Sequence, residues 1–194
     1  GSTYGADRKP VRARDLKASG ADTLFTIATP KFAAQTIRKI AELGWKPAHY
    51  VVSVSSSHGQ VLTPAGLDNA KGLMTAMTMK LVGNPSWDDS PDMKAYLAFL
   101  KEWLPENNPL DSSAVLGYIV GHVLTHVIKN AGDNLTRENL LKQATSINNQ
   151  TFPMLLPGVT INTTPTDYSP FKIFRTARFD GTQWVLYGDP IKVD

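Results

Sequence analysis

The stretch TLFTIATPKFAAQTIRKIAELGWKPAHYVVSV, residues Thr23–Val54, decides the fold of this chain. Its first part, Thr23–Ala28, is a mostly apolar run that is short enough for a buried strand. A helix is predicted over Lys31–Leu43, and Tyr50–Val54 is rich in the β-branched residues that favour strands. A strand, a helix and a second strand in this order form a right-handed crossover between parallel strands. The sequence therefore predicts an α/β fold built on a parallel sheet.

The predicted helix carries signals at both of its ends. Thr29-Pro30 places proline at the helix start, where its missing N–H removes no helical hydrogen bond. Gly44 follows the last turn, where glycine commonly ends a helix. We expect Phe32, Ile37 and Ile40 to lie on the apolar side of this helix.

Further elements follow along the chain. A strand is predicted over Lys71–Met79, and Asn84–Trp87 breaks it. Helices are predicted over Asp92–Trp103, over Ser112–Asn130 and from Thr136 to about Ile147. No internal repeat, low-complexity tract or long linker is present, so the sequence marks no clear domain boundary.

Caps are predicted for the last two of these helices. Ser112 or Ser113 is expected to cap the first of them, and Gly132 is expected to close it. Thr136 is expected to be the N-cap of the second, because its hydroxyl can accept a hydrogen bond from a backbone N–H of the first turn.

The region Pro153–Asp189 ends in a predicted hairpin. Asp180-Gly181 supplies the pair of positive-φ residues that a two-residue type I′ turn requires. Phe179 before the turn, and Trp184 and Leu186 after it, alternate as strand residues do.

Composition and charge exclude several classes of protein. The 194 residues are 42% hydrophobic and 9% aromatic, which is ordinary for a chain that buries a core. The formal net charge is +3, and the dense basic cluster Arg8–Arg14 contains no interleaved aromatic residue. This favours solvated terminal charge, and we expect no nucleic-acid partner. Cysteine is absent, which excludes disulfides, thiol nucleophiles and sulfur-bound zinc.

Hydropathy gives no sign of a membrane segment. No run approaches the roughly 20 apolar residues that span a bilayer, and no charged and then apolar signal sequence opens the chain. We therefore expect a soluble protein from which any export signal has been removed.

Two loops are candidates for ligand contact. In open parallel sheets, ligands bind beyond the carboxyl ends of the strands. Ala28-Thr29-Pro30 precedes a helix whose first N–H groups and positive dipole end suit a carboxylate. Ser53–Gly59 offers hydroxyls that donate or accept hydrogen bonds. The alternative is that these serines only cap the next turn of the chain.

Enzymatic and metal-binding interpretations find little support. His122 and His126 stand four residues apart on one predicted helix, but Val123-Leu124-Thr125 between them lacks the glutamate of a metalloprotease motif. Ser55 and His58 are a potential nucleophile and base, yet no Gly-x-Ser-x-Gly elbow is present. No nucleotide-binding glycine motif follows a strand. We expect a protein without catalytic activity, cofactor or metal.

Motifs that together point to a known family are spread along nearly the whole chain. They are Ala21-Asp22, Ile27–Gln35, Gly44–Pro47, Leu62–Leu67, Gly117-Tyr118, Gly132–Asn139, Leu155–Gly158, Ile161–Thr163, Pro165–Pro170, Arg178–Gly181 and Trp184. With these motifs the chain resembles the substrate-binding proteins of ABC importers. The resemblance is to the branched-chain amino-acid type, which has the type I periplasmic binding protein fold, and within it to members that bind aromatic acids.

The resemblance implies two Rossmann-like lobes with parallel sheets, joined by hinge strands, that close over a small molecule. Residues 1–80 would form part of the second lobe, residues 81–175 the returning segment of the first lobe, and residues 176–194 the closing strands of the second lobe. The ligand-binding residues implied are Thr29, Pro30, Ser53 and Ser55 from the second lobe and Tyr118 from the first. Tyr118 would stack on the ligand or hydrogen-bond to it; the alternative is a core tyrosine on an amphipathic helix.

One departure from the family pattern bears on the ligand. Amino-acid binders of this family hold the ammonium of the ligand with an acidic side chain whose position falls close to Ser53. This chain has no Asp or Glu between Trp45 and Leu67. Because a buried ammonium without a paired anion is unfavourable, the sequence predicts an aromatic or other carboxylate rather than an α-amino acid.

The function implied is that of the periplasmic, solute-binding component of an ABC importer, which delivers its ligand to a membrane permease. A sensory or interaction domain of the same fold is the alternative, as is a truncated remnant that no longer binds ligand. Family members are far longer, and we expect this chain to be a C-terminal portion that lacks most of the first lobe. Exposed sheet edges and helix faces would then be covered by a missing N-terminal segment or by self-association.

Overall fold

The structure is a computed structural model that describes residues 12–193. The chain forms two compact units. Unit 1 comprises residues 12–76 and Ala177–Tyr187, and unit 2 comprises Met77–Thr176 and residues 188–193. The chain therefore passes between the units at three points, after Ala76, Thr176 and Tyr187. The assignment of residues 1–80, 81–175 and 176–194 to lobes of a two-lobed protein stays a prediction.

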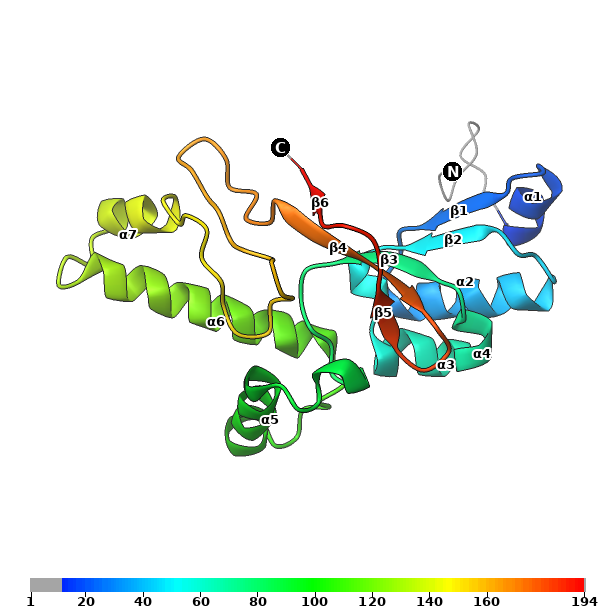
Figure 1. Ribbon diagram of the computed structural model, residues 1–194, viewed down its shortest axis with the longest axis horizontal. Coiled ribbons are helices and arrows are strands. Elements are labelled where there is room, and N and C mark those ends of the chain that lie inside the picture. Colours follow the sequence, from blue (N-terminus) through cyan, green and yellow to red (C-terminus); the bar gives the residue numbers. More distant parts are fainter. Residues whose placement is uncertain (1–11, 194) are drawn as a thin grey trace. The chain divides into compact units, whose positions relative to one another are not determined.

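Unit 1 contains a sheet that is parallel in its first part. The elements are α1 (Ala13–Ala18), β1 (Thr23–Thr26), α2 (Pro30–Glu42), β2 (Ala48–Val51), the 3-10 turn η1 (Ser53–Ser55), the π-helical turn η2 (His58–Leu62), α3 (Thr63–Ala65), α4 (Leu67–Ala70), most of β3 (Met74–Met77), the end of β4 (Ile173–Phe179) and β5 (Trp184–Leu186). The strand order is β1-β2-β3-β4-β5 (Figure 1). β1, β2 and β3 pair in parallel, and β4 pairs with β5 antiparallel. The predicted α/β fold with a parallel sheet is confirmed.

One face of β1 and β2 is buried against α2, which runs along these strands in Figure 1. The two strands are aligned residue by residue, from Thr23 opposite Ala48 to Thr26 opposite Val51. The buried side chains of this layer are Leu24, Thr26, His49 and Val51 from the strands and Ala33, Ala34, Ile37 and Ile40 from α2. On the other face, the exposed ring of Phe25 stacks on Tyr50 with ring centroids 4.9 Å apart.

Phe32 corrects the prediction that it lies on the apolar, buried side of its helix. Its side chain is 60% exposed, whereas Ile37 and Ile40 are buried as predicted. Each helical residue turns the chain by about 100°, so Phe32 points about 140° away from Ile37. Because Ala33 and Ala34 fill the buried stripe at this end of α2, Phe32 is free to face solvent.

The hairpin between β4 and β5 is confirmed, but its turn is not the predicted two-residue type I′ turn. Phe179 pairs with Trp184, which leaves a four-residue connection. Asp180 does not have a positive φ; instead its Oδ1 accepts hydrogen bonds from the N–H groups of Thr182 and Gln183 at 2.7 and 2.8 Å. The aspartate side chain therefore closes a longer loop, in which only Gly181 has a positive φ, of 110°.

Unit 2 is built mainly from helices. Its elements are η3 (Pro85–Trp87), α5 (Pro91–Trp103), α6 (Ser112–Ala131), α7 (Arg137–Ala144), the start of β4 and β6 (Ile191–Lys192). β6 pairs antiparallel with the start of β4, from Ile173 opposite Lys192 to Phe174 opposite Ile191.

The helix caps of unit 2 differ in part from those predicted. α6 is capped by Asp111, whose Oδ1 accepts a hydrogen bond from the N–H of Ser113 at 2.8 Å, and not by Ser112 or Ser113. A carboxylate also complements the positive end of the helix dipole, which a serine hydroxyl does not. Thr136 caps α7 as predicted, and α7 ends at Ala144 rather than near Ile147.

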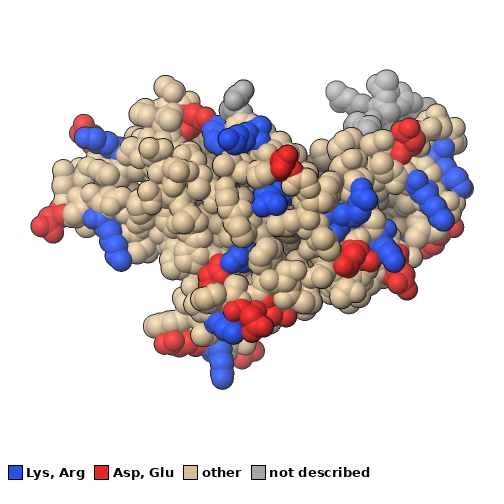
Figure 2. All heavy atoms as spheres, viewed as in Figure 1, with Lys and Arg blue, Asp and Glu red and all other residues tan. Residues whose placement is uncertain are grey.

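α6 exposes an uncharged apolar face. Leu116, Val120, Leu124 and Ile128 follow one another at intervals of one helical turn, and each is 43–55% exposed. The only Lys, Arg, Asp or Glu of α6 is Lys129, and Figure 2 shows few charged side chains over this helix. Coverage of such faces by another segment or by self-association stays a prediction.

Asp92, in the first turn of α5, joins three segments of unit 2. Its carboxylate accepts hydrogen bonds from Lys80 Nζ at 2.7 Å and from the backbone N–H of Met154 at 2.9 Å. Met154 has a φ of 69°, a conformation that non-glycine residues rarely adopt. Partial burial opposes ionisation of Asp92, but hydrogen bonds from Lys80, Met154 and Ser90 outweigh it and lower the pKa of this carboxyl to about 2.

We predict that acid removes the stabilisation that Asp92 provides. Its pKa is lower in the folded than in the unfolded chain, so its contribution is present above about pH 4 and is lost as the pH falls towards 2. Between pH 5 and pH 2, the free energy of unfolding should fall by about 2 kcal/mol more in the wild type than in Asp92→Asn, as measured by urea denaturation. Asp133→Asn, at an exposed position after α6, is the control. An equal loss in the wild type and Asp92→Asn would contradict the prediction.

Candidate functional site

The carboxyl ends of β1 and β2 place the two candidate loops at one edge of unit 1. β1 ends at Thr26 and β2 at Val51, and these two residues are opposite each other in the parallel ladder. The N–H of Val52 continues the ladder by donating to the carbonyl of Thr26 at 3.1 Å. The segments that carry Thr29-Pro30 and Ser53–Ser55 therefore begin side by side.

Ser55 holds these two segments together. Its hydroxyl donates a hydrogen bond of 2.6 Å to the carbonyl oxygen of Ala28, and the residue is completely buried. The N–H of Ser55 donates to the carbonyl of Val52 at 2.8 Å, which begins the 3-10 turn. Ser55 thus positions the loops, and its contact with a ligand stays a prediction.

Two hydroxyls at this edge have no hydrogen-bond partner among residues 12–193. Thr29 is the N-cap residue of α2, but its side chain makes no capping bond and is exposed. Ser53 begins η1 and is also exposed. Each hydroxyl can therefore donate a hydrogen bond to a ligand oxygen.

The first turn of α2 adds a polar backbone group. The carbonyl of Thr29 accepts hydrogen bonds from the N–H groups of Phe32 and Ala33, and Pro30 has no N–H. The N–H of Lys31 then remains without a partner in the described chain, at the positive end of a 13-residue helix. An anion near Thr29 would be stabilised by this end of α2.

Three apolar side chains at this edge were missed by the sequence analysis as functional candidates. Ile27, Phe32 and Val54 are 81%, 60% and 56% exposed, and they lie in the loop after β1, the first turn of α2 and η1. They offer a surface for the apolar part of a ligand. Their sequence pattern is that of core residues, so only the structure shows that they face outward.

Tyr118 lies on α6 in unit 2, within an aromatic cluster. Its ring centroid is 5.2 Å from that of Tyr96, 5.1 Å from that of Phe99 and 4.6 Å from that of His122. Burial, and then the charge of Asp92, raises the pKa of Tyr118 above its ordinary value, so its hydroxyl remains protonated at neutral pH. Its contact with a ligand stays a prediction.

The residues considered for catalysis and metal binding have other partners. Ser55 donates to Ala28, while the ring of His58 lies 3.2 Å from the carbonyl oxygen of Thr182, so the two do not form a nucleophile and base pair. His126 bonds with Asn130 and contacts the ring of Phe152. No group of three or more potential metal ligands occurs in the described part of the chain.

The comparison with protein families identifies the class of protein. The periplasmic binding protein model matches residues 9–181, and the chain belongs to this family. No curated protein sequence matches the chain.

Part of the basic cluster Arg8–Arg14 falls outside the described residues. Within residues 12–193, no helix is long and apolar enough to cross a membrane.

Solved structures with the same fold include a periplasmic substrate-binding protein and two proteins that are named as parts of ABC transporters. A branched-chain amino-acid ABC transporter from Thermus thermophilus with bound valine is 16% identical, with a TM-score of 0.73. The match covers 93% of this chain and 48% of that chain. A substrate-binding periplasmic protein from Ralstonia solanacearum is 21% identical, with a TM-score of 0.69 and coverage of 89% and 48%. A fatty acid ABC transporter substrate-binding protein from Thermomonospora curvata is 19% identical, with a TM-score of 0.64 and coverage of 93% and 46%. The chain thus spans about half the length of these proteins.

We predict that Ser55→Ala destabilises the protein, because it leaves the carbonyl of Ala28 without its hydrogen bond. Loss of one partner at a buried site costs about 1–3 kcal/mol. The melting temperature should therefore fall by several degrees. Ser113→Ala, at an exposed position of α6, is the matched control. A melting temperature of Ser55→Ala equal to that of the control would show that the bond does not stabilise the loops.

Proposed function

We propose that this chain is the solute-binding component of an ABC importer that captures a small carboxylate, preferably an aromatic acid, in the periplasm. The captured solute is delivered to a membrane permease, and no chemical step is involved. Closure of two lobes over the ligand, and a contact from Tyr118, are parts of this proposal that come from the family resemblance.

The observation that carries the proposal is the polar edge at the carboxyl ends of β1 and β2. The hydroxyls of Thr29 and Ser53 and the N–H of Lys31 are unpaired donors in the described chain, and all belong to the loops that Ser55 joins. A carboxylate offers two oxygens with several acceptor positions, which this set of donors matches.

The charge at this edge favours an acid over an amino acid. No Asp or Glu occurs between Trp45 and Leu67, so the loop that carries Ser53 offers no anion for a ligand ammonium. The exposed side chains of Ile27, Phe32 and Val54 suit an aromatic or aliphatic body. Valine and fatty acids, which two of the similar structures name, both carry a carboxylate.

We predict that aromatic carboxylates stabilise the protein in a thermal-shift screen, because a ligand that binds only the folded state raises its melting temperature. The screen compares benzoate-type acids, branched-chain amino acids and buffer alone. Aromatic acids should raise the melting temperature, and the amino acids should have no effect. Stabilisation by amino acids alone would overturn the ligand class, and no response to any compound would favour a remnant that no longer binds.

We further predict that Thr29→Val and Ser53→Ala each weaken binding of the best acid about ten-fold or more. Each removes a hydrogen bond to a charged group, which is worth about 1.5–3 kcal/mol. Isothermal titration calorimetry would measure the dissociation constants. Thr36→Val, the same type of substitution at a half-buried position later in α2, should leave the affinity unchanged. Unchanged affinity in both site variants would place the ligand elsewhere.

A further inference from the structure

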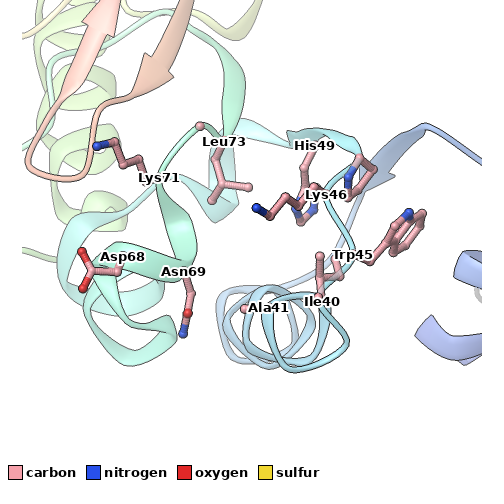
Figure 3. A pocket seen from close by; sticks show the side chains of 12 residues that line it. Ile40, Ala41, Trp45, Lys46, His49, Asp68, Asn69, Lys71 and Leu73 are labelled. Carbon is pink, nitrogen blue, oxygen red and sulfur yellow. The ribbon is translucent and has the colours of Figure 1, made fainter.

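A cavity of about 390 Å³ lies in unit 1 at the amino ends of β2 and β3 (Figure 3). It is lined by residues that precede these strands, such as Lys46, Pro47 and Leu73, and by the last turns of α2. Thr29 and Ser53 follow the carboxyl ends of the parallel strands, so the cavity lies at the opposite edge of the sheet. It is therefore distinct from the proposed solute site.

The walls of this cavity combine apolar and polar side chains. Ile40 from α2 and Leu73 before β3 line it and are only 6% and 3% exposed, and Pro47 adds a third apolar surface. Trp45 also lines the cavity, but its indole N–H already donates to the carbonyl of Ala21 at 3.2 Å. The apolar part of the wall suits the apolar body of a small molecule.

Lys46 brings a cation to the cavity. Figure 3 shows its ammonium extending into the space between His49 and Leu73. Within residues 12–193 this ammonium makes neither a hydrogen bond nor an ion pair. Lys46 is not needed as a hydrogen-bond donor to the carbonyl groups at the end of α2. Lys17 Nζ donates to the carbonyl of Leu43 at 2.7 Å, and the N–H of Trp45 donates to the carbonyl of Ile40.

His49 supplies a second polar group from the wall. The residue is only 7% exposed, and its Nε2 lies 2.8 Å from the hydroxyl oxygen of Thr26. The other ring nitrogen, Nδ1, makes no hydrogen bond within the described chain. It is also not one of the side-chain atoms that are fully enclosed and lack a hydrogen-bond partner. Nδ1 is therefore reachable from the cavity that the residue lines.

The state of the imidazole follows from its burial. Burial lowers the pKa of His49 to about 4, so the ring is neutral at pH 7 and carries a single N–H. When the hydroxyl of Thr26 donates to Nε2, that N–H is at Nδ1 and points to the cavity side of the ring. The cavity then presents one cation and one neutral donor.

Asp68 and Lys71 also line the cavity, but their charged ends lie outside the space that Lys46 enters (Figure 3). The side chain of Lys71 lies beside Gly181, and its charge acts on Asp180 in the β4–β5 loop. One ammonium without a partner matches a ligand with a single negative charge.

We propose that this cavity is a second binding site, which takes a small monocarboxylate with an apolar body. The carboxylate is held by Lys46 Nζ and by the Nδ1–H of His49, and the body lies between Ile40 and Leu73.

Titration of the isotope-labelled chain with benzoate, followed by backbone amide NMR, tests this proposal. Saturable shifts are expected at residues 44–49 and 72–73. Lys46→Met should weaken this binding about ten-fold or more, because it removes the ammonium that extends into the cavity. Lys39→Met, which removes an exposed lysine of α2 outside the cavity lining, should leave it unchanged. Benzamide, which has the same shape without the charge, should bind more weakly than benzoate by a similar factor.

The outcomes separate this site from the proposed solute site. Shifts at residues 44–49 that persist in the Thr29→Val, Ser53→Ala double variant but are lost in Lys46→Met support the proposal. Shifts confined to residues 27–32 and 53–57, or shifts at residues 44–49 that Lys46→Met does not weaken, overturn it. Absence of any shift with benzoate also overturns it, whatever the solute site binds.

Discussion

The parallel alignment of β1 with β2 is the constraint on which the rest of unit 1 depends. Because both strands run in one direction, the segments that follow them meet at one edge and the segments that precede them meet at the other. The hydrogen bond between Thr26 and His49 crosses the two strands within their buried face. The same register therefore brings the loops that carry Thr29 and Ser53 together at one edge, and it holds the imidazole of His49, which lines the cavity, against Thr26.

Local signals in the sequence predicted most of the fold, and they failed where a side chain had two possible roles. Pro30 and Thr136 marked helix starts correctly, because their effect depends only on their own backbone position. Asp111 was missed as a cap because two serines follow it and either is also a good cap residue. Asp180 was assigned a backbone role, while its carboxylate instead accepts hydrogen bonds within the loop.

The sequence located the candidate site only to a pair of loops, because the topology of the sheet determines which loops meet but not how their side chains pack. The rule for parallel sheets pointed to the loops with Thr29 and Ser53, and these loops do begin side by side. The rule does not reveal that Ser55 turns inward to Ala28 or that Ile27 faces solvent, because these depend on the packing around each residue. The cavity beside Lys46 arises where a helix end meets two strand starts, an arrangement without a sequence signature.

Trp184 is a fluorophore that contacts the loop Ser53–Gly59. Its indole N–H donates a hydrogen bond of 2.8 Å to the carbonyl of Ser56, and the residue is only 2% exposed. Its ring also lies 5.5 Å from that of Phe179. Any movement of the loop that breaks this bond changes the surroundings of the indole, and hence its emission. In a variant in which Trp45, Trp87 and Trp103 are replaced by Phe, the conformation of the segment after β2 can thus be followed by intrinsic fluorescence without a label.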